Sequence, residues 1–125
     1  MIEGRSKIIL CNISEIQDPG SLEFAVETSA GVLEIFLIRK GKNVYGYHNQ
    51  CPHTGVCLNW MPDQFLDLSG SLIQCATHGA LFRIEDGYCL RGPCAGENLK
   101  KFELTIEDDG EIYCAECDTT GVRAV

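Results

Sequence analysis

The sequence predicts an all-β fold, and three observations favour it. Short runs rich in β-branched and aromatic residues recur along the 125 residues, and glycine-bearing turns separate them. Helical periodicity is nearly absent, with Asp63 to Leu68 as the one weak candidate. The dipeptides Asp86-Gly87 and Asp109-Gly110 predict hairpin turns, because glycine tolerates the positive φ that such turns require.

Each expected strand follows from an apolar or β-branched run bounded by turn residues. The run KIILCNI predicts the first strand, and a hairpin around Ser29-Ala30-Gly31 joins the second to the third. The turn at Lys40-Gly41-Lys42 then leads into a fourth. In chain order the expected strands are Lys7 to Ile13, Leu22 to Glu27, Val32 to Arg39, Asn43 to His48, Ser71 to Gln74, Ala80 to Ile84, Phe102 to Glu107 and Glu111 to Cys114.

The length predicts a single domain with one modest core, spanning residues 1–125. We expect an antiparallel base into which a smaller subdomain, about Tyr47 to Leu90, is inserted. Ile2-Glu3-Gly4-Arg5 looks like the remnant of a protease-cleavage tag, and a native segment is the equal alternative for residues 1–5. Asp118 to Val125 is expected to be a flexible tail.

The charge and hydropathy exclude several classes of partner. A net charge of −8 argues against nucleic acid, whose phosphates would repel the chain. The same charge suits a partner with a basic docking face, although it would also serve solubility alone. No apolar run approaches the ~18–20 residues that span a bilayer, so no membrane partner is expected. The N-terminus has no signal-peptide pattern, and we expect a cytoplasmic protein.

The most informative feature is a pair of short motifs that each combine one cysteine with one histidine. Cys51-Pro52-His53 separates the two side chains by one residue, and Cys75-Ala76-Thr77-His78 separates them by two. Glycine follows each motif closely, which permits backbone to approach an inorganic group. Cys51, His53, Cys75 and His78 together supply two sulfur and two nitrogen ligands, and the pattern predicts a metal site.

Two metals suit that ligand set. A [2Fe–2S] centre of the Rieske type needs two cysteines on one iron and two histidines on the other. A tetrahedral zinc site can use the same four ligands. Zinc fingers usually pair like ligands within a loop, whereas each loop here contributes one of each. The pattern therefore favours iron–sulfur and leaves a zinc-binding interaction module as the alternative.

With these two motifs, the chain resembles a small soluble Rieske ferredoxin. The resemblance covers roughly Ile8 to Cys114 and rests on the blocks CPHTG, CATHGALF and GPCAGENL. One departure is the segment from Thr54 to Gln74, which is longer than family members usually have between their motifs.

The resemblance implies stacked antiparallel sheets that hold one [2Fe–2S] cluster at the tip of two loops. Cys51 and Cys75 would bind the inner iron of this cluster, and His53 and His78 would bind the outer iron. The loop at Pro93 resembles one that shields the cluster from a third side.

Two substitutions bear on the reduction potential. High-potential respiratory members place a serine and a tyrosine just past the second histidine, and here Ala80 and Phe82 stand in those places without a hydroxyl to donate. Respiratory members also bridge their two loops with a disulfide. Here Cys57 could supply one half of it, but Thr77 stands where the partner cysteine would be. We therefore expect a potential near the low end of the Rieske range and a ferredoxin-like carrier.

The expected function is that of a one-electron carrier without a catalytic site, passing electrons from a flavin-dependent reductase to an oxygenase or another redox enzyme. A terminal oxygenase would need a second iron bound by two histidines and a carboxylate, and only His48 remains for it. A fixed small subunit of a nitrite-reductase-type enzyme is the alternative. Many such subunits lack the cluster ligands, which favours the shuttle.

The remaining notable residues have ordinary interpretations. His48 is expected to be solvated at a strand end, and Trp60 and Phe65 to pack beneath the inter-loop segment. Eight cysteines without an export signal do not predict a disulfide framework. Cys57 and Cys94 are the thiols expected nearest the metal site. The other thiols expected to be small apolar or incidental groups are Cys11, Cys89, Cys114 and Cys117.

Overall fold

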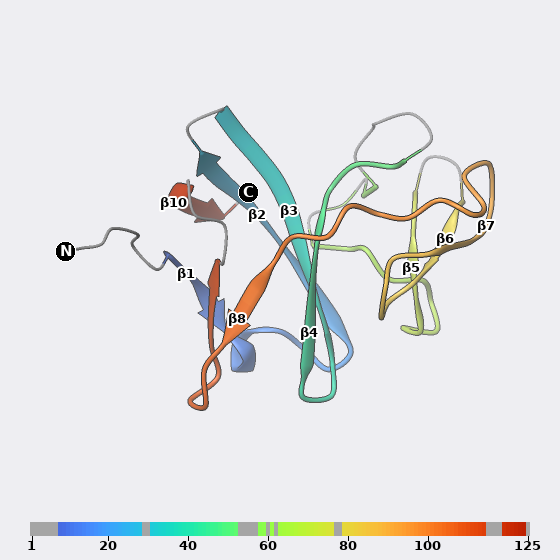
Figure 1. Cartoon of the computed structure of the whole chain (residues 1–125). Coiled ribbons are helices and arrows are strands. Elements are labelled where there is room, and N and C mark those ends of the chain that lie inside the picture. Colours follow the sequence, from blue (N-terminus) through green and yellow to red (C-terminus); the bar gives the residue numbers. More distant parts are fainter. Residues whose placement is uncertain are drawn as a thin grey trace.

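The computed structural model is built almost entirely of antiparallel strands (Figure 1). It describes residues 8–28, 31–52, 58–59, 61, 63–76, 79–114 and 119–124. The strands are β1 (Ile8–Asn12), β2 (Gly20–Thr28), β3 (Gly31–Lys40), β4 (Asn43–His48), β5 (Leu72–Gln74), β6 (Leu81–Arg83), β7 (Cys89–Arg91), β8 (Leu104–Ile106), β9 (Glu111–Cys114) and β10 (Thr119–Ala124). The described part of the chain holds no helix of the length and apolarity needed to cross a bilayer.

The strands form three sheets. The base sheet has four strands in the order β10-β2-β3-β4, and two sheets of three strands flank it. One has the order β1-β9-β8, and the other, which we name the site sheet, has the order β5-β6-β7. In Figure 1 the base sheet lies between the other two. All the strand pairings are antiparallel, as the all-β prediction requires.

Strand β3 is the centre of this arrangement because both of its faces are buried. Four consecutive residues, Ile35 to Ile38, have no solvent exposure. Successive side chains of a strand point to opposite faces, so Phe36 and Ile38 belong to one core and Ile35 and Leu37 to the other. The uninterrupted apolar run of β3 is thus explained by burial on two sides.

The two cores are distinct. The base core joins the base sheet to β1 and β9, and the site core joins it to the site sheet. The base core comprises Leu10, Cys11, Ile16, Phe24, Val26, Ile35, Leu37, Phe102, Ile112 and Cys114. The site core comprises Phe36, Ile38, Tyr47, Cys51, Leu58, Phe65, Ile73, Cys75, Ala80, Phe82, Ile84, Cys89, Cys94 and Leu99.

A buried hydrogen bond joins the base sheet to the turn after β6. The hydroxyl of Tyr47, on β4, donates to the carbonyl oxygen of Ile84 at 2.6 Å, and burial raises the pKa of this phenol. Lys40 and Glu85 form an ion pair between the same two regions at the surface. Exposed ion pairs contribute about 0–1 kcal/mol, whereas an unsatisfied buried group costs roughly 1–3 kcal/mol. The buried bond is therefore the stronger link.

The chain returns from the site sheet to the base along β4. Phe102 N–H donates to Gly46 O at 2.9 Å, and His48 N–H donates to Lys100 O at 2.8 Å. A Cβ at Gly46 would lie 2.7 Å from the carbonyl oxygen of Phe102, so only glycine permits this close approach.

Several expectations need correction. Asp63 to Leu68 is not a helix: Leu66 forms an isolated antiparallel bridge with Ile73, and Phe65 points into the site core. The expected flexible tail is also wrong for Thr119–Ala124, which form β10 and pair with β2. Strand β7 was not expected, because three residues carry too little alternation to reveal a strand. The first strand ends one residue early, at a 3-10 turn (Ile13–Glu15) that Asn12 caps.

Removing the Tyr47 hydroxyl tests the link between the two sheets. The Tyr47→Phe variant should lose about 1–3 kcal/mol of unfolding free energy, because the buried carbonyl of Ile84 loses its donor. Urea denaturation would measure this as a lower midpoint with an unchanged slope. Tyr88→Phe is the matched control, since Tyr88 is 37% exposed, and it should change stability by less than about 0.5 kcal/mol. Equal midpoints for the two variants would contradict the assignment.

Candidate metal centre

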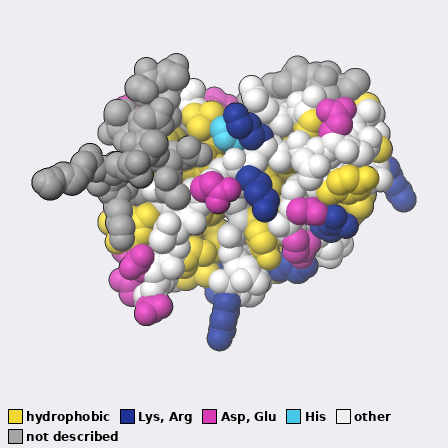
Figure 2. Space-filling model, viewed as in Figure 1, with side chains coloured by type: hydrophobic (Ala, Val, Ile, Leu, Met, Phe, Trp, Pro, Cys, Tyr) yellow, Lys and Arg dark blue, Asp and Glu magenta, His cyan; other side chains and the backbone are white. Residues whose placement is uncertain are grey.

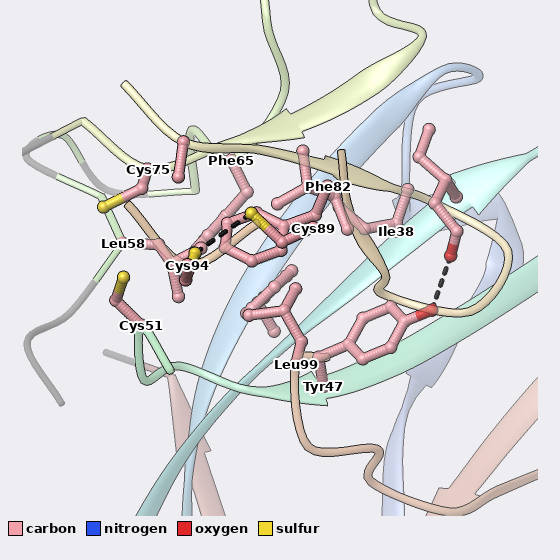
Figure 3. Packing of buried hydrophobic residues seen from close by; sticks show 14 residues of the cluster. Ile38, Tyr47, Cys51, Leu58, Phe65, Cys75, Phe82, Cys89, Cys94 and Leu99 are labelled. Carbon is pink, nitrogen blue, oxygen red and sulfur yellow. Dashed lines mark hydrogen bonds between the residues drawn. The ribbon is translucent and has the colours of Figure 1, made fainter. Parts of the chain in front are cut away.

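Two buried cysteines from separate loops lie at one edge of the site core. Cys51 follows β4 by three residues and is 1% exposed, and Cys75 directly follows β5 and is 0% exposed. In Figure 3 their sulfur atoms point toward the same side, away from the apolar interior that Leu58 and Phe82 help to form. Neither cysteine forms a disulfide within the described residues, and the thiolate is the form of cysteine that binds a metal.

Backbone hydrogen bonds join the described residues on the two sides of the second cysteine loop. Cys75 N–H donates to Ala80 O at 2.8 Å, and Gly79 N–H donates to Cys75 O at 2.8 Å. Gly79 has a φ of +69°, which glycine adopts without strain. Ala76 N–H donates to Leu58 O at 2.7 Å and so joins the second cysteine loop to the segment that follows the first. These bonds fix the backbone of Cys75 and link the residue after it to Leu58.

The first loop is held by a chain of polar side chains. Asn49 is 2% exposed, and its Oδ1 accepts from Leu58 N–H at 2.8 Å. Its Nδ2 donates to Asn59 Oδ1 at 3.0 Å, and Asn59 Nδ2 donates to Glu23 Oε1 at 3.1 Å. The same Glu23 oxygen accepts from Asp63 N–H at 3.1 Å. The chain therefore connects the segment beyond Cys51 to β2 of the base sheet.

This polar chain was not foreseen from the sequence. Asn49, Asn59 and Glu23 lie far apart along the chain and form no motif, and Asn and Glu are most often surface residues. Only the folded structure reveals the role: Asn49 and Glu23 are buried, and a buried polar group must find a partner.

A third loop, residues 91–97, packs against the second. Gly92 has a φ of +111°, and a Cβ there would lie 2.8 Å from the Cα of Ala80. Pro93 is exposed and Cys94 is fully buried. The loop therefore lies beside the Cys75 loop, where the resemblance places a shielding segment, and Cys94 contributes the inward-facing side chain.

The surroundings of the two cysteines are apolar. Ala80 and Phe82 are both fully buried in the site core and offer no hydroxyl. Phe65 stacks on Phe36 with ring centroids 4.2 Å apart, which supports the prediction that it packs beneath the inter-loop segment. A low local dielectric of this kind strengthens any hydrogen bond that is made to a charged sulfur.

The other predicted site residues lie outside the described part of the chain. These are His53 and His78, together with Cys57, Thr77, Trp60 and Cys117. Within the described residues no group of three or more metal-ligating side chains is present. The cysteine half of the predicted ligand set thus has the burial and the common orientation that a bound metal centre requires.

The prediction for His48 is wrong, and the one for Cys11 agrees with the structure. His48 is 8% exposed at the end of β4 and meets the ring of Phe102 edge-on at 6.0 Å. Burial, and secondarily the charge of Lys100, lower its pKa, so it is neutral near pH 7.

Burial first, then Glu15 and Glu111, raise the pKa of Cys11 to about 11, as expected of a small apolar core residue.

Comparison with known proteins decides the family. The model of the Rieske [2Fe–2S] domain matches residues 6–103, which include both cysteine loops and the loop at Pro93. The chain belongs to the Rieske [2Fe–2S] domain family. As a member it carries one [2Fe–2S] cluster, so the zinc alternative is set aside.

Relatives of known identity agree with this assignment. Ferredoxin CarAc of Metapseudomonas resinovorans is 29% identical over 106 residues, which is 85% of this chain and 90% of that protein. The ferredoxin of carbazole 1,9a-dioxygenase from Nocardioides aromaticivorans has a similar fold, with a TM-score of 0.66 at 19% identity over 88% of this chain and 97% of that one. A chain in a complex of reduced oxygenase and oxidized ferredoxin in carbazole 1,9a-dioxygenase has a TM-score of 0.67 at 22% identity, covering 94% and 98%.

The buried Asn49 gives a test of how the first loop is held. Asn49→Ala leaves Leu58 N–H without its acceptor, so the variant should lose about 1–3 kcal/mol of stability and bind less iron per chain. Iron analysis and thermal unfolding measure the two effects. Asn98→Ala is the matched control, because Asn98 is exposed and its one described bond, to Asp86 O, is 3.2 Å long. Equal iron content in the two variants would contradict the role of Asn49.

Proposed function

We propose that this protein is a one-electron carrier that passes electrons from a flavin-dependent reductase to an oxygenase. Its ligands would be Cys51 and Cys75 on the inner iron and His53 and His78 on the outer iron. When bound, the cluster accepts and returns one electron. The observation that carries the proposal is the common orientation of two buried cysteines, from separate loops, within a Rieske domain.

The donor set explains why such a site suits electron transfer. Two thiolates and two neutral imidazoles leave the cluster formally neutral when oxidised and singly negative when reduced, which eases reduction relative to four thiolates. Cys51 and Cys75 lie on the apolar side of the site, so the histidines that follow them would be the ligands nearer solvent. An electron would then enter and leave on the histidine side.

The partner assignment draws on the relatives and on charge. One similar structure is a complex of a ferredoxin with its oxygenase, and this chain has nearly the length of that ferredoxin. The net charge of −8 favours a partner with a basic face. Figure 2 shows acidic and basic side chains interspersed on the viewed face, so this face carries no large field of one sign. The net negative charge of the whole chain, and not one acidic patch on this face, would therefore attract a basic partner at long range.

The proposal includes four further points. The protein has no catalytic site of its own, acts in the cytoplasm and folds as one domain. The cluster-binding part, expected at about residues 47–90, would extend further, because Cys94 and Leu99 belong to the site core.

A fixed subunit of a nitrite-reductase-type enzyme is the alternative, and gel filtration of the native protein distinguishes a free carrier from it.

Substitution of the ligands tests the proposed site. Cys75→Ser or His78→Ala should abolish the visible absorbance and reduce the iron content from two per chain to near zero, because a Rieske centre needs all four ligands. Dithionite bleaching and iron analysis are the measurements. Cys11→Ser is the control, since Cys11 lies in the base core, and it should retain the cluster. Full iron and colour in the ligand variants would refute the assignment.

The apolar surroundings predict the reduction potential. Since Ala80 and Phe82 provide no hydroxyl, the midpoint should lie toward the low end of the roughly −150 to +300 mV Rieske range. Protein-film voltammetry measures it directly. A midpoint well above zero would show that other donors compensate and would contradict a ferredoxin-type role.

A further inference from the structure

Two thiols that the proposed cluster site does not use lie in contact inside the site core. Cys89, at the start of β7, and Cys94, in the loop 91–97, have their sulfur atoms 3.0 Å apart, and a dashed line joins them in Figure 3. Both cysteines are free thiols in this structure. A disulfide bond is about 2.05 Å long, so the two sulfurs need to approach by roughly 1 Å to form one.

The backbone of the loop brings the two thiols together. Gly96 N–H donates to Cys89 O at 3.0 Å, and Cys89 N–H donates to Glu97 O at 2.7 Å. Glu97 N–H donates to Cys94 O at 2.9 Å. The φ of Gly96 is +93°, which glycine adopts without strain. The chain therefore turns back beside Cys89, and the contact between the sulfurs follows from this turn.

Access to the pair is controlled by the loop. Cys94 is the one buried residue of loop 91–97, and its neighbours on both sides are exposed. The closed loop leaves Cys89 and Cys94 only 1% and 0% exposed, so an oxidant in solution does not reach them. Local opening of a surface loop costs less free energy than global unfolding. Opening breaks the backbone bonds to Cys89 and carries Cys94 outward, so oxidation would begin at Cys94.

We propose that Cys89 and Cys94 are a reversible dithiol–disulfide pair that, when oxidised, locks loop 91–97 onto β7. Disulfides of cytosolic proteins are usually transient and catalytic or redox-sensing, and this isolated pair suits a redox-sensing role. Gly92 of the same loop packs against Ala80, at the end of the Cys75 loop. The lock would therefore also hold the segment that lies beside the second cysteine loop.

A low-molecular-weight disulfide, such as oxidised glutathione, is the oxidant. The sulfur of Cys94 attacks one sulfur of oxidised glutathione, which breaks its S–S bond, forms a mixed disulfide and releases one reduced glutathione. The sulfur of Cys89 then attacks the sulfur of Cys94 and displaces the second glutathione as the loop closes. The protein gives up two electrons and its two thiol protons, and the two glutathione molecules receive them.

The inference goes beyond the proposed function, because it requires the folded loop and no electron transfer through the cluster. Its test begins with the cluster-loaded protein in buffers of defined reduced and oxidised glutathione, after which free thiols are alkylated. Trypsin cleaves after Arg83, Arg91 and Lys100, so Cys89 and Cys94 fall on separate peptides, residues 84–91 and 92–100. Oxidising buffer should join these two peptides by a disulfide, and reducing buffer should return both in alkylated form.

Hydrogen exchange measures the lock itself. The amide of Gly96, which donates to Cys89 O, should exchange at least about tenfold more slowly in the oxidised protein, because the loop then opens less often. Cys89→Ser should abolish both the joined peptides and the slower exchange. Cys114→Ser is the matched control: it removes a buried thiol of the base core and should keep both effects.

Each contrary result identifies a different failure. Alkylated, unjoined peptides in the most oxidising buffer overturn the inference, and so does a disulfide that joins Cys94 to any cysteine other than Cys89. Joined peptides that appear only as the visible colour is lost also overturn it, because they would come from a disrupted site. If Cys89→Ser does not fold, the peptides of the wild type decide. A protein that is colourless as purified but still forms the Cys89–Cys94 disulfide would refute the proposed function and not this inference.

Discussion

The double-sided burial of β3 is the constraint on which the rest of the structure depends. Because Phe36 and Ile38 face the site core while Ile35 and Leu37 face the base core, one strand belongs to both. The site sheet cannot shift against the base sheet without exposing apolar surface to water. Each Å² of apolar surface exposed in this way costs about 25 cal/mol of free energy. This rigidity is what an electron carrier needs, since its ligand loops must keep one geometry in two charge states.

The two cysteine loops are attached to this frame by different means. Backbone hydrogen bonds join the described residues on both sides of the Cys75 loop, whereas the side chains of Asn49, Asn59 and Glu23 join the described residues that flank the Cys51 loop. The polar chain favours one arrangement, because a buried side chain such as Asn49 costs free energy when it is left without a partner. Side-chain hydrogen bonds therefore hold the residues that flank the Cys51 loop, and backbone hydrogen bonds hold those that flank the Cys75 loop.

Strands with a clear pattern were predicted closely, and those without one were not. Asn43–His48 and Glu111–Cys114 coincide with their predicted bounds, and β3 extends one residue beyond its prediction at each end. Strand β7 and the paired strand β10 were missed, because three residues or a polar terminal run become strands only by pairing with a neighbour. The apolar residues at 63–68 suggested a helix, but Phe65 is apolar because it fills the site core.

The sequence by itself determined the all-β class and predicted the donor types of the site, since strand alternation and the spacing of cysteine and histidine are local properties that can be read along the chain. Only the tertiary structure decided which buried groups meet: Asn49 with Leu58, and Tyr47 with Ile84. These contacts join residues with no shared motif, and they exist because a closed interior must satisfy every polar group it buries. A local sequence pattern does not show which distant residues will satisfy that requirement, because the partners meet only in the folded chain.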